Sequence, residues 1–282
     1  MALFVAVQHR RQPLPNEGFN VAWVYAIPPW LFAMGVIAGM SLLAGGGLVV
    51  VRRSNLQNPD WAHNDVAGPI IGTIGTVLAV MLSFMVVTVW QEYDQAAATV
   101  QAEASAVADI YRLNGSLPEP TRTALYHSLR QYVALVIHDE WPRMRYGGQS
   151  DAAQQTAFEI LRTVARFQPA TPAEQNIQSQ AIVLAAAFSD ARRQRLFDNA
   201  QAIPIIMWIM MVFIAAITIG FCYLFRVRSF LVHMLMTVAL AATIGAVFVL
   251  IAEFDLPFRG DLQLPPTPFV RLEHVTFTQG DI

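Results

Sequence analysis

The sequence predicts an all-α membrane protein in which four transmembrane helices form two hairpins and a helical extramembrane domain is inserted between spans 2 and 3. Of the 282 residues, 55% are hydrophobic and only 13% are charged, which is far too apolar for an ordinary soluble domain. Four apolar runs each reach the length of about 20 residues that a helix needs to cross the hydrocarbon core. Between the second and third runs the chain is polar, and its apolar residues recur at helical spacing.

The N-terminal segment, residues 1–26, is not expected to be a cleavable signal peptide. Arg10 and Arg11 are followed by Pro13 and Pro15. A signal peptide would instead continue into a short apolar core that ends at small residues. We assign no structure to this segment.

The four apolar runs are the candidate membrane spans. The first three contain no charged residue, and the fourth contains only His233, near its beginning. Short connections join the first run to the second and the third to the fourth. Residues 27–90 and 203–252 are therefore predicted to form two transmembrane hairpins, followed by a C-terminal tail at 253–282. In chain order the runs are Pro28 to Val51, Val66 to Trp90, Ile203 to Phe225 and Ser229 to Ala252.

Residues 91–202 are predicted to form a helical extramembrane domain. Apolar residues recur there every three or four positions in four segments, which is typical of amphipathic helices. After Trp90 no Gly or Pro occurs until Gly115, and none separates the fourth segment from Ile203. The sequence therefore predicts that span 2 and the first domain helix form one rod of about 70 Å, at 1.5 Å per residue. The fourth domain helix is likewise expected to continue into span 3.

The arginines leave the membrane orientation open. Positive charge in short flanking segments marks the cytoplasmic side of a membrane protein. Arg52, Arg53, Arg226 and Arg228 flank the spans on the side of the hairpin loops. On the domain side the flanking arginines are Arg10, Arg11, Arg192, Arg193, Arg195 and Arg259. The two sides nearly balance, so both orientations remain possible on this ground.

Composition and motifs exclude several classes of function. The formal net charge of −2 provides no basic footprint for nucleic acid. Cys222 is the one cysteine, which rules out an intramolecular disulfide and any multi-cysteine metal site. Metalloprotease, serine-hydrolase, P-loop and dinucleotide-binding signatures are missing from the sequence. We therefore predict no enzyme activity, no catalytic residue, no cofactor, no bound metal and no nucleic-acid partner.

The second span has a face of small and hydroxylated residues. Small residues let membrane helices approach closely, so helix packing is one explanation. The other is that this face lines a narrow pore on the axis of an oligomer. On that hypothesis the pore-lining candidates are Gly72, Thr76, Val80, Ser83 and Phe84.

Acidic residues follow two of the spans on the domain side. Glu92 and Asp94 come after the second span, and Glu253 and Asp255 come after the fourth. Such residues commonly mark the boundary between membrane and water. In a symmetric oligomer, the same four positions would form carboxylate rings that raise the local concentration of cations.

Two segments resemble bestrophin channels. The run from Leu82 to Asp94 resembles the end of the bestrophin pore helix, where an apolar stretch closes on a Trp and then on a Tyr followed by an acid. The run from Glu253 to Gly260 is similar to the Asp-Pro-Phe-Gly stretch after the last bestrophin span. From about Gly68 to Phe269 the chain more closely resembles the bacterial bestrophin-like family of unknown function. The further residues that carry this resemblance are Glu103-Ala104, Tyr111-Arg112 and Glu140-Trp141-Pro142.

This resemblance implies a bestrophin-like fold and a homo-oligomeric, pentameric ion channel whose pore is lined by span 2. It places the protein in the bacterial inner (plasma) membrane as a multi-pass protein, with the helical domain and both termini cytoplasmic. The implied partners are the lipid bilayer, further copies of the chain and inorganic ions. Bestrophins include anion-selective and cation-selective members, so the selectivity does not transfer.

The sequence departs from the bestrophin pattern at two places. Gly72, Thr76 and Val80 stand where the bestrophin neck has bulky apolar side chains, which argues against a hydrophobic gate there. The acidic calcium clasp of the animal channels is reduced to Asp261, so calcium activation is not predicted. The alternative to a channel is a membrane-anchored signalling or scaffold protein whose helical domain binds a partner. The long rods favour it, as does the lack of charged residues within the spans, where transport sites often place one.

Overall fold

A computed structural model describes residues 28–54, 64–225, 227–260 and 262–277. All regular secondary structure in these ranges is helical, which confirms the predicted all-α class. Four helices are long and apolar enough to cross a membrane. The N-terminal segment 1–26 and Asp261 lie outside the described residues. The helices are α1 (Pro29–Arg53), α2 (Asn64–Asn114), α3 (Thr121–Leu135), α4 (Trp141–Met144), α5 (Asp151–Arg166), α6 (Pro172–Ala200), α7 (Ile205–Cys222), α8 (Phe230–Phe254) and α9 (Thr267–Leu272), with π-helical turns η2 (Val136–Glu140) and η3 (Glu273–Phe277).

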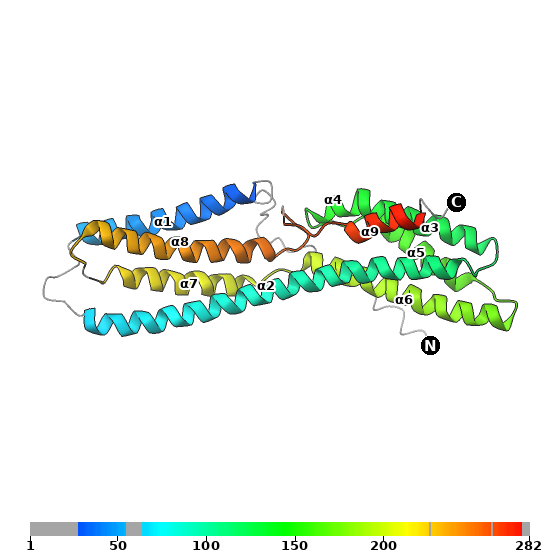
Figure 1. Ribbon diagram of the computed structural model, residues 1–282, viewed down its shortest axis with the longest axis horizontal. Coiled ribbons are helices and arrows are strands. Elements are labelled where there is room, and N and C mark those ends of the chain that lie inside the picture. The colour runs from blue at the N-terminus through cyan, green and yellow to red at the C-terminus, as the bar shows by residue number, and fades with distance from the viewer. Residues whose placement is uncertain (1–27, 55–63, 226, 261, 278–282) are drawn as a thin grey trace, which may run out of the picture.

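The molecule is elongated, and α2 runs along most of its length (Figure 1). At one end the first half of α2 lies with α1, α7 and α8, the other three apolar helices (Figure 1). At the opposite end the second half of α2 lies with α3, α5, α6 and α9 (Figure 1). A single helix therefore connects the apolar half of the molecule to the polar half.

Helix α2 is continuous over 51 residues, as predicted for span 2 and the first domain helix. At 1.5 Å per residue, it is about 75 Å long. Pro69 lies near its beginning, and beyond Gly75 the helix contains neither Gly nor Pro. Nothing in the sequence therefore interrupts its backbone hydrogen bonds between the two halves of the molecule.

The predicted continuity of the fourth domain helix with span 3 is wrong. Helix α6 ends at Ala200 and α7 begins at Ile205, and residues 201–204 between them are not helical. Pro204 explains the break, because it lacks an N–H group and disfavours the helical conformation of the residue before it. The N–H of Ile203, which no longer has a helical partner, donates to Oδ1 of Asp255 at 2.7 Å.

Packing in the apolar half joins helices that are distant in sequence. Helix α1 packs mainly against α8, while α2 packs against α7 and α8. Glycine permits a close approach at Gly47, where a Cβ atom would lie 2.5 Å from the hydroxyl of Tyr223. That hydroxyl donates to the carbonyl of Ala44 at 2.9 Å. These contacts join α1 to the end of α7, while the main packing of α1 is with α8 rather than with α2, its neighbour in the chain.

The polar half has a core of its own, formed by the second half of α2 with α3, α5, α6 and the residues after α8. Trp141 is central to it: the indole N–H donates to the carbonyl of Leu264 at 2.8 Å, and the ring lies edge-on to Phe258. Phe269 packs beside the same indole. Much of the predicted C-terminal tail is therefore docked against the helical bundle.

Candidate functional site

The five pore-lining candidates share one uncovered face of α2. Gly72, Thr76, Val80, Ser83 and Phe84 are all exposed in the single chain. Phe84 is 69% exposed and Val80 is 49% exposed. Successive candidates are three or four residues apart except for the adjacent Ser83 and Phe84, which places them along one side of the helix. The structure thus brings the candidates together on a surface that no described helix of the same subunit covers.

The opposite side of α2 holds the helix against its own subunit. Leu78, Leu82, Met85 and Val89 are buried there, at spacings of three and four residues. They pack with Met211, Ala215, Ile244 and Ile251 of α7 and α8. Helix α2 therefore has a bulky packed side and an uncovered side in the membrane, although both sides are nearly free of charge.

The glycines of α2 do not serve packing within the subunit. A Cβ atom added at Gly68, Gly72 or Gly75 would meet no described atom within 4 Å. By contrast, the Cβ added at Gly47 of α1 would collide with Tyr223. Close approach to a described helix of the same chain therefore does not explain these three glycines.

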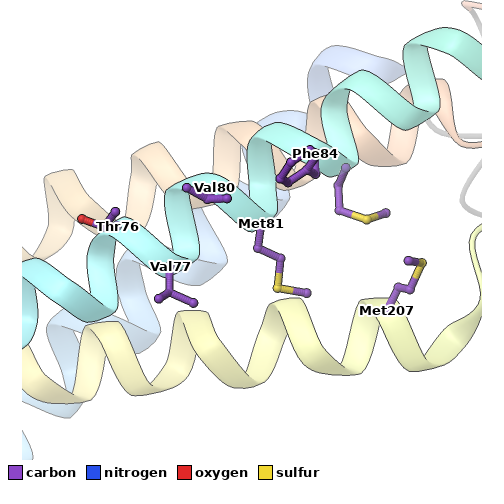
Figure 2. A pocket seen from close by; sticks show the side chains of 7 residues that line it. Thr76, Val77, Val80, Met81, Phe84 and Met207 are labelled. Carbon is purple, nitrogen blue, oxygen red and sulfur yellow. The ribbon is translucent and has the colours of Figure 1, made fainter.

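An apolar groove of about 490 Å³ runs between α2 and α7 beside this face. Val77 and Met81 point from α2 toward α7, and Met207 faces them from α7 (Figure 2). Thr76, Val80 and Phe84 form its outer edge (Figure 2). Its lining is almost entirely apolar, so the groove itself offers no site for an ion.

The acidic candidates separate into two groups. Glu92 and Asp255 line a common cavity of about 380 Å³ at the junction of α2, α6 and the end of α8. Asp198 of α6 lies in the same cavity and was not predicted. Asp94 is exposed on α2 and Glu253 is half-buried at the end of α8, and neither lines the cavity. The rest of the lining is mostly uncharged and polar: Thr88, Gln91, Gln95, Gln194, Gln201 and Pro257.

Asp255 has a structural role at the α6–α7 break. Burial raises the pKa of its carboxyl group, and the hydrogen bond that it accepts from the N–H of Ile203 opposes this change. Asp255 therefore stabilises the start of span 3 as well as contributing charge to the cavity.

A buried ionic network, which sequence reasoning did not identify, lies in the polar half. The guanidinium of Arg195 donates to both carboxylate oxygens of Glu103 at 2.6 and 3.0 Å, and to Glu140 at 2.8 Å. Arg192 donates to both oxygens of Glu140 at 2.6 and 2.8 Å. The hydroxyl of Tyr132 donates to Glu103 and accepts from Arg192. All five side chains are buried, and they tie α2, α3, η2 and α6 together.

The network keeps the carboxylate of Glu140 ionised although it is buried. Burial alone would raise the pKa of Glu140, but the charge of Arg195 and the hydrogen bonds and charge of Arg192 outweigh it and lower that pKa. Burial and the nearby charge of Glu103 raise the pKa of Tyr132 well above its usual value, so its hydroxyl stays protonated. One sequence signal could have revealed the network: Glu103 falls within the apolar stripe of Val100, Ala104 and Val107.

Histidines, cysteines and carboxylates do not gather into a metal site. No group of three or more such side chains is placed to hold a metal ion in the part of the chain that the structure describes. His127 and His138, the histidines of the helical insert, lie on α3 and η2.

Comparison with known proteins places this architecture in a family. The model of the Bestrophin-like domain matches residues 26–269, which is most of the chain. Among solved structures, a bacterial bestrophin homologue from Klebsiella pneumoniae that carries one leucine-to-threonine substitution is similar in fold. Its TM-score is 0.58 at 12% sequence identity, and the match covers 84% of this chain and 96% of that one. No curated protein matches the chain. The family match extends over all four spans and the helical bundle, and the chain belongs to the Bestrophin-like family.

Proposed function

We propose that the protein is a homo-oligomeric ion channel, with five subunits, in which the uncovered face of α2 lines the pore. The observation that carries this proposal is the composition of that face. Within one subunit this face of α2 is uncovered, and it lies in the middle of a membrane span. Such a face must meet lipid, a neighbouring subunit or water.

Lipid contact is a poor explanation, because the other outward surfaces of the apolar half look different. Helix α1 exposes Leu42 and Leu43, which are 75% and 78% exposed. Phe213 of α7 and Met236 of α8 are also strongly exposed and bulky. These side chains suit acyl chains. The face of α2 instead alternates glycine, alanine and hydroxyl residues with Val80 and Phe84, as expected of a helix on the axis of an oligomer.

A hydroxyl residue gives this face weak polarity without charge. Thr76 donates its hydroxyl proton to the carbonyl of Gly72 at 2.9 Å. Its oxygen lone pairs remain available toward the uncovered side. A pore built from several copies would therefore have a ring of weak acceptors at Thr76 and apolar rings at Val80 and Phe84.

The alternative, a membrane-anchored scaffold, is favoured by one observation. Helix α6 of the polar half exposes Ile182 and Val183 next to each other, and Phe197 further along. These residues would suit a protein partner of the helical bundle. They would equally suit a second copy of the chain, which is what the channel proposal requires.

Single-particle imaging of the purified protein in mild detergent, together with its particle mass, separates the two functions. The channel proposal expects a five-fold ring with α2 of each subunit around a central opening. A monomer, or a two-fold dimer without an axial opening, would refute the channel and leave the scaffold.

A further inference from the structure

The uncovered face of α2 continues out of the membrane span to Asp94. Thr76 and Asp94 are 18 residues apart, which is five turns at 3.6 residues per turn, so both lie on the same side of one unbroken helix. Val87, two turns before Asp94, is also uncovered at 51%. If Thr76 faces the axis of an oligomer, Asp94 faces the same axis about 27 Å further along, at 1.5 Å per residue.

Helix α2 carries negative charge at this end of the pore and no positive charge before Arg112. The acidic residues between Gly68 and Arg112 are Glu92, Asp94, Glu103 and Asp109. Two of these are neutralised: Glu103 is buried against Arg195, and Asp109 pairs with Arg112 at 2.6 Å. Glu92 and Asp94 remain as the charges of α2 near the domain-side mouth of the span.

The arginines near this mouth are engaged elsewhere. Arg192 and Arg195 point into the buried network, and Arg193 pairs with Asp190 at the surface. Arg259 stays near the cavity: its charge acts on Asp255, and its guanidinium donates to the carbonyl of Asn199 at 3.5 Å. Burial raises the pKa of Glu92, Asp198 and Asp255, the carboxyl groups of this cavity, and so favours their neutral forms. Asp94 is exposed and lies outside the cavity, so its carboxyl group is the one on the uncovered side of α2.

We infer that the channel selects cations and that Asp94 is its selectivity-determining residue. This inference rests on the proposed function, because Asp94 reaches an axis only if several copies of α2 surround one. Each subunit then contributes one Asp94 carboxylate at the same height, and the copies form a ring at the domain-side end of the pore. A ring of fixed negative charge bordered by the low-dielectric membrane concentrates cations and repels anions.

The test is the reversal potential of the reconstituted full-length protein in planar bilayers under a KCl gradient. The wild type is expected to pass K⁺ over Cl⁻ by about tenfold or more, the lower end of what charged clefts achieve. Asp94→Asn is expected to bring the permeability ratio toward one, and Asp94→Arg to favour Cl⁻. Asp94→Glu keeps the charge and should keep the selectivity. Glu159→Gln is the matched control, because Glu159 is exposed on α5, which packs against α3 and α6.

Each failure has a distinct meaning. A wild-type channel that prefers Cl⁻ would overturn the inference and leave the proposed function intact. Cation selectivity that is unchanged in Asp94→Asn would remove Asp94 as its determinant. A correctly assembled ring that passes no ions would refute the proposed function, and the inference with it. Gel filtration of each variant confirms that it assembles before its currents are compared.

Discussion

Arg195→Ala is expected to prevent stable folding of the polar half. The change removes the partner of two buried carboxylates, Glu103 and Glu140, and breaking a buried ion pair in this way costs about 3–5 kcal/mol. That is a large part of the total stability of a typical domain, about 5–15 kcal/mol. Glu140 keeps Arg192, whereas Glu103 keeps only the hydroxyl of Tyr132 among the partners in the network. The loss should therefore arise mainly at Glu103.

Thermal unfolding in detergent, followed by far-UV circular dichroism and gel filtration, measures the effect. Arg193→Ala is the control, because Arg193 lies on the same helix, is exposed and pairs only with the exposed Asp190. It should melt close to the wild type, as surface ion pairs contribute little. Wild-type behaviour of Arg195→Ala would show that the network does not hold the bundle together.

The source of the destabilisation can be checked with a compensating change. Arg195→Met leaves the carboxyl group of Glu103 buried without its arginine partner, so Glu103→Gln in the same chain should restore part of the lost stability. If the double variant is less stable than Arg195→Met alone, unpaired charge is not the cause.

The network should also weaken in acid. Because the folded pKa of Glu140 is lowered, its contribution is complete above its ordinary value of 4.5 and is lost as the pH falls through the folded value.

Val80→Trp is expected to abolish ion flux without preventing assembly. Val80 is half-exposed on the proposed pore face, in the middle of the apolar part of α2. On an axis of symmetry every subunit adds one indole at the same height, and together these rings would fill a narrow pore. We expect flux into liposomes to fall by about 90% or more, as a blocked constriction requires.

The matched control for Val80→Trp is Leu43→Trp on α1. Leu43 is 78% exposed on α1, which lies on the opposite side of the apolar half from α2 (Figure 1), so an added indole there would be far from the proposed pore. This variant should conduct as the wild type does. If Val80→Trp assembles normally and conducts as well as Leu43→Trp, then α2 does not form the pore wall.

The length of the apolar runs and the periodicity of apolar residues are sufficient to predict the four spans and the continuity of α2. The four spans follow from uncharged runs, and the continuity of α2 follows from the lack of Gly or Pro between Trp90 and Gly115. The break between α6 and α7 was not predicted. The stretch without Gly or Pro reaches only to Ile203, and Pro204, the next residue, interrupts the helix. The pairing of α1 with α8 depends on contacts over a long separation in sequence, such as that of Gly245 with Met40, which no local pattern reports.

The candidate site was predictable only where it lies along a single helix. The five positions of the α2 face follow from spacing alone, and the structure places all of them on one uncovered surface. The cavity of Glu92 and Asp255 also contains Asp198, which a third element contributes. Arg192 and Arg195 count as membrane-flanking charges in the sequence, yet both are buried and paired. Which residue pairs with a charged side chain depends on how the helices pack, and the sequence of one helix does not specify this.

The exposure of Thr76 to the permeation path is the most direct test of the pore assignment. Replacing Cys222 by serine removes the one native thiol, and Thr76→Cys then provides a single cysteine on the proposed pore face. Leu43→Cys in the same background provides a cysteine on the outward surface of α1. Water-soluble methanethiosulfonate reagents of either charge are then applied while the current is recorded.

Rapid, irreversible block of Thr76→Cys, with no effect on Leu43→Cys, is the result predicted for a pore lined by α2. Prior treatment with the reagent in the absence of a gradient should give the same block. If conducting Thr76→Cys channels are unaffected by reagents of both charges, ions pass by another route and the central claim is contradicted.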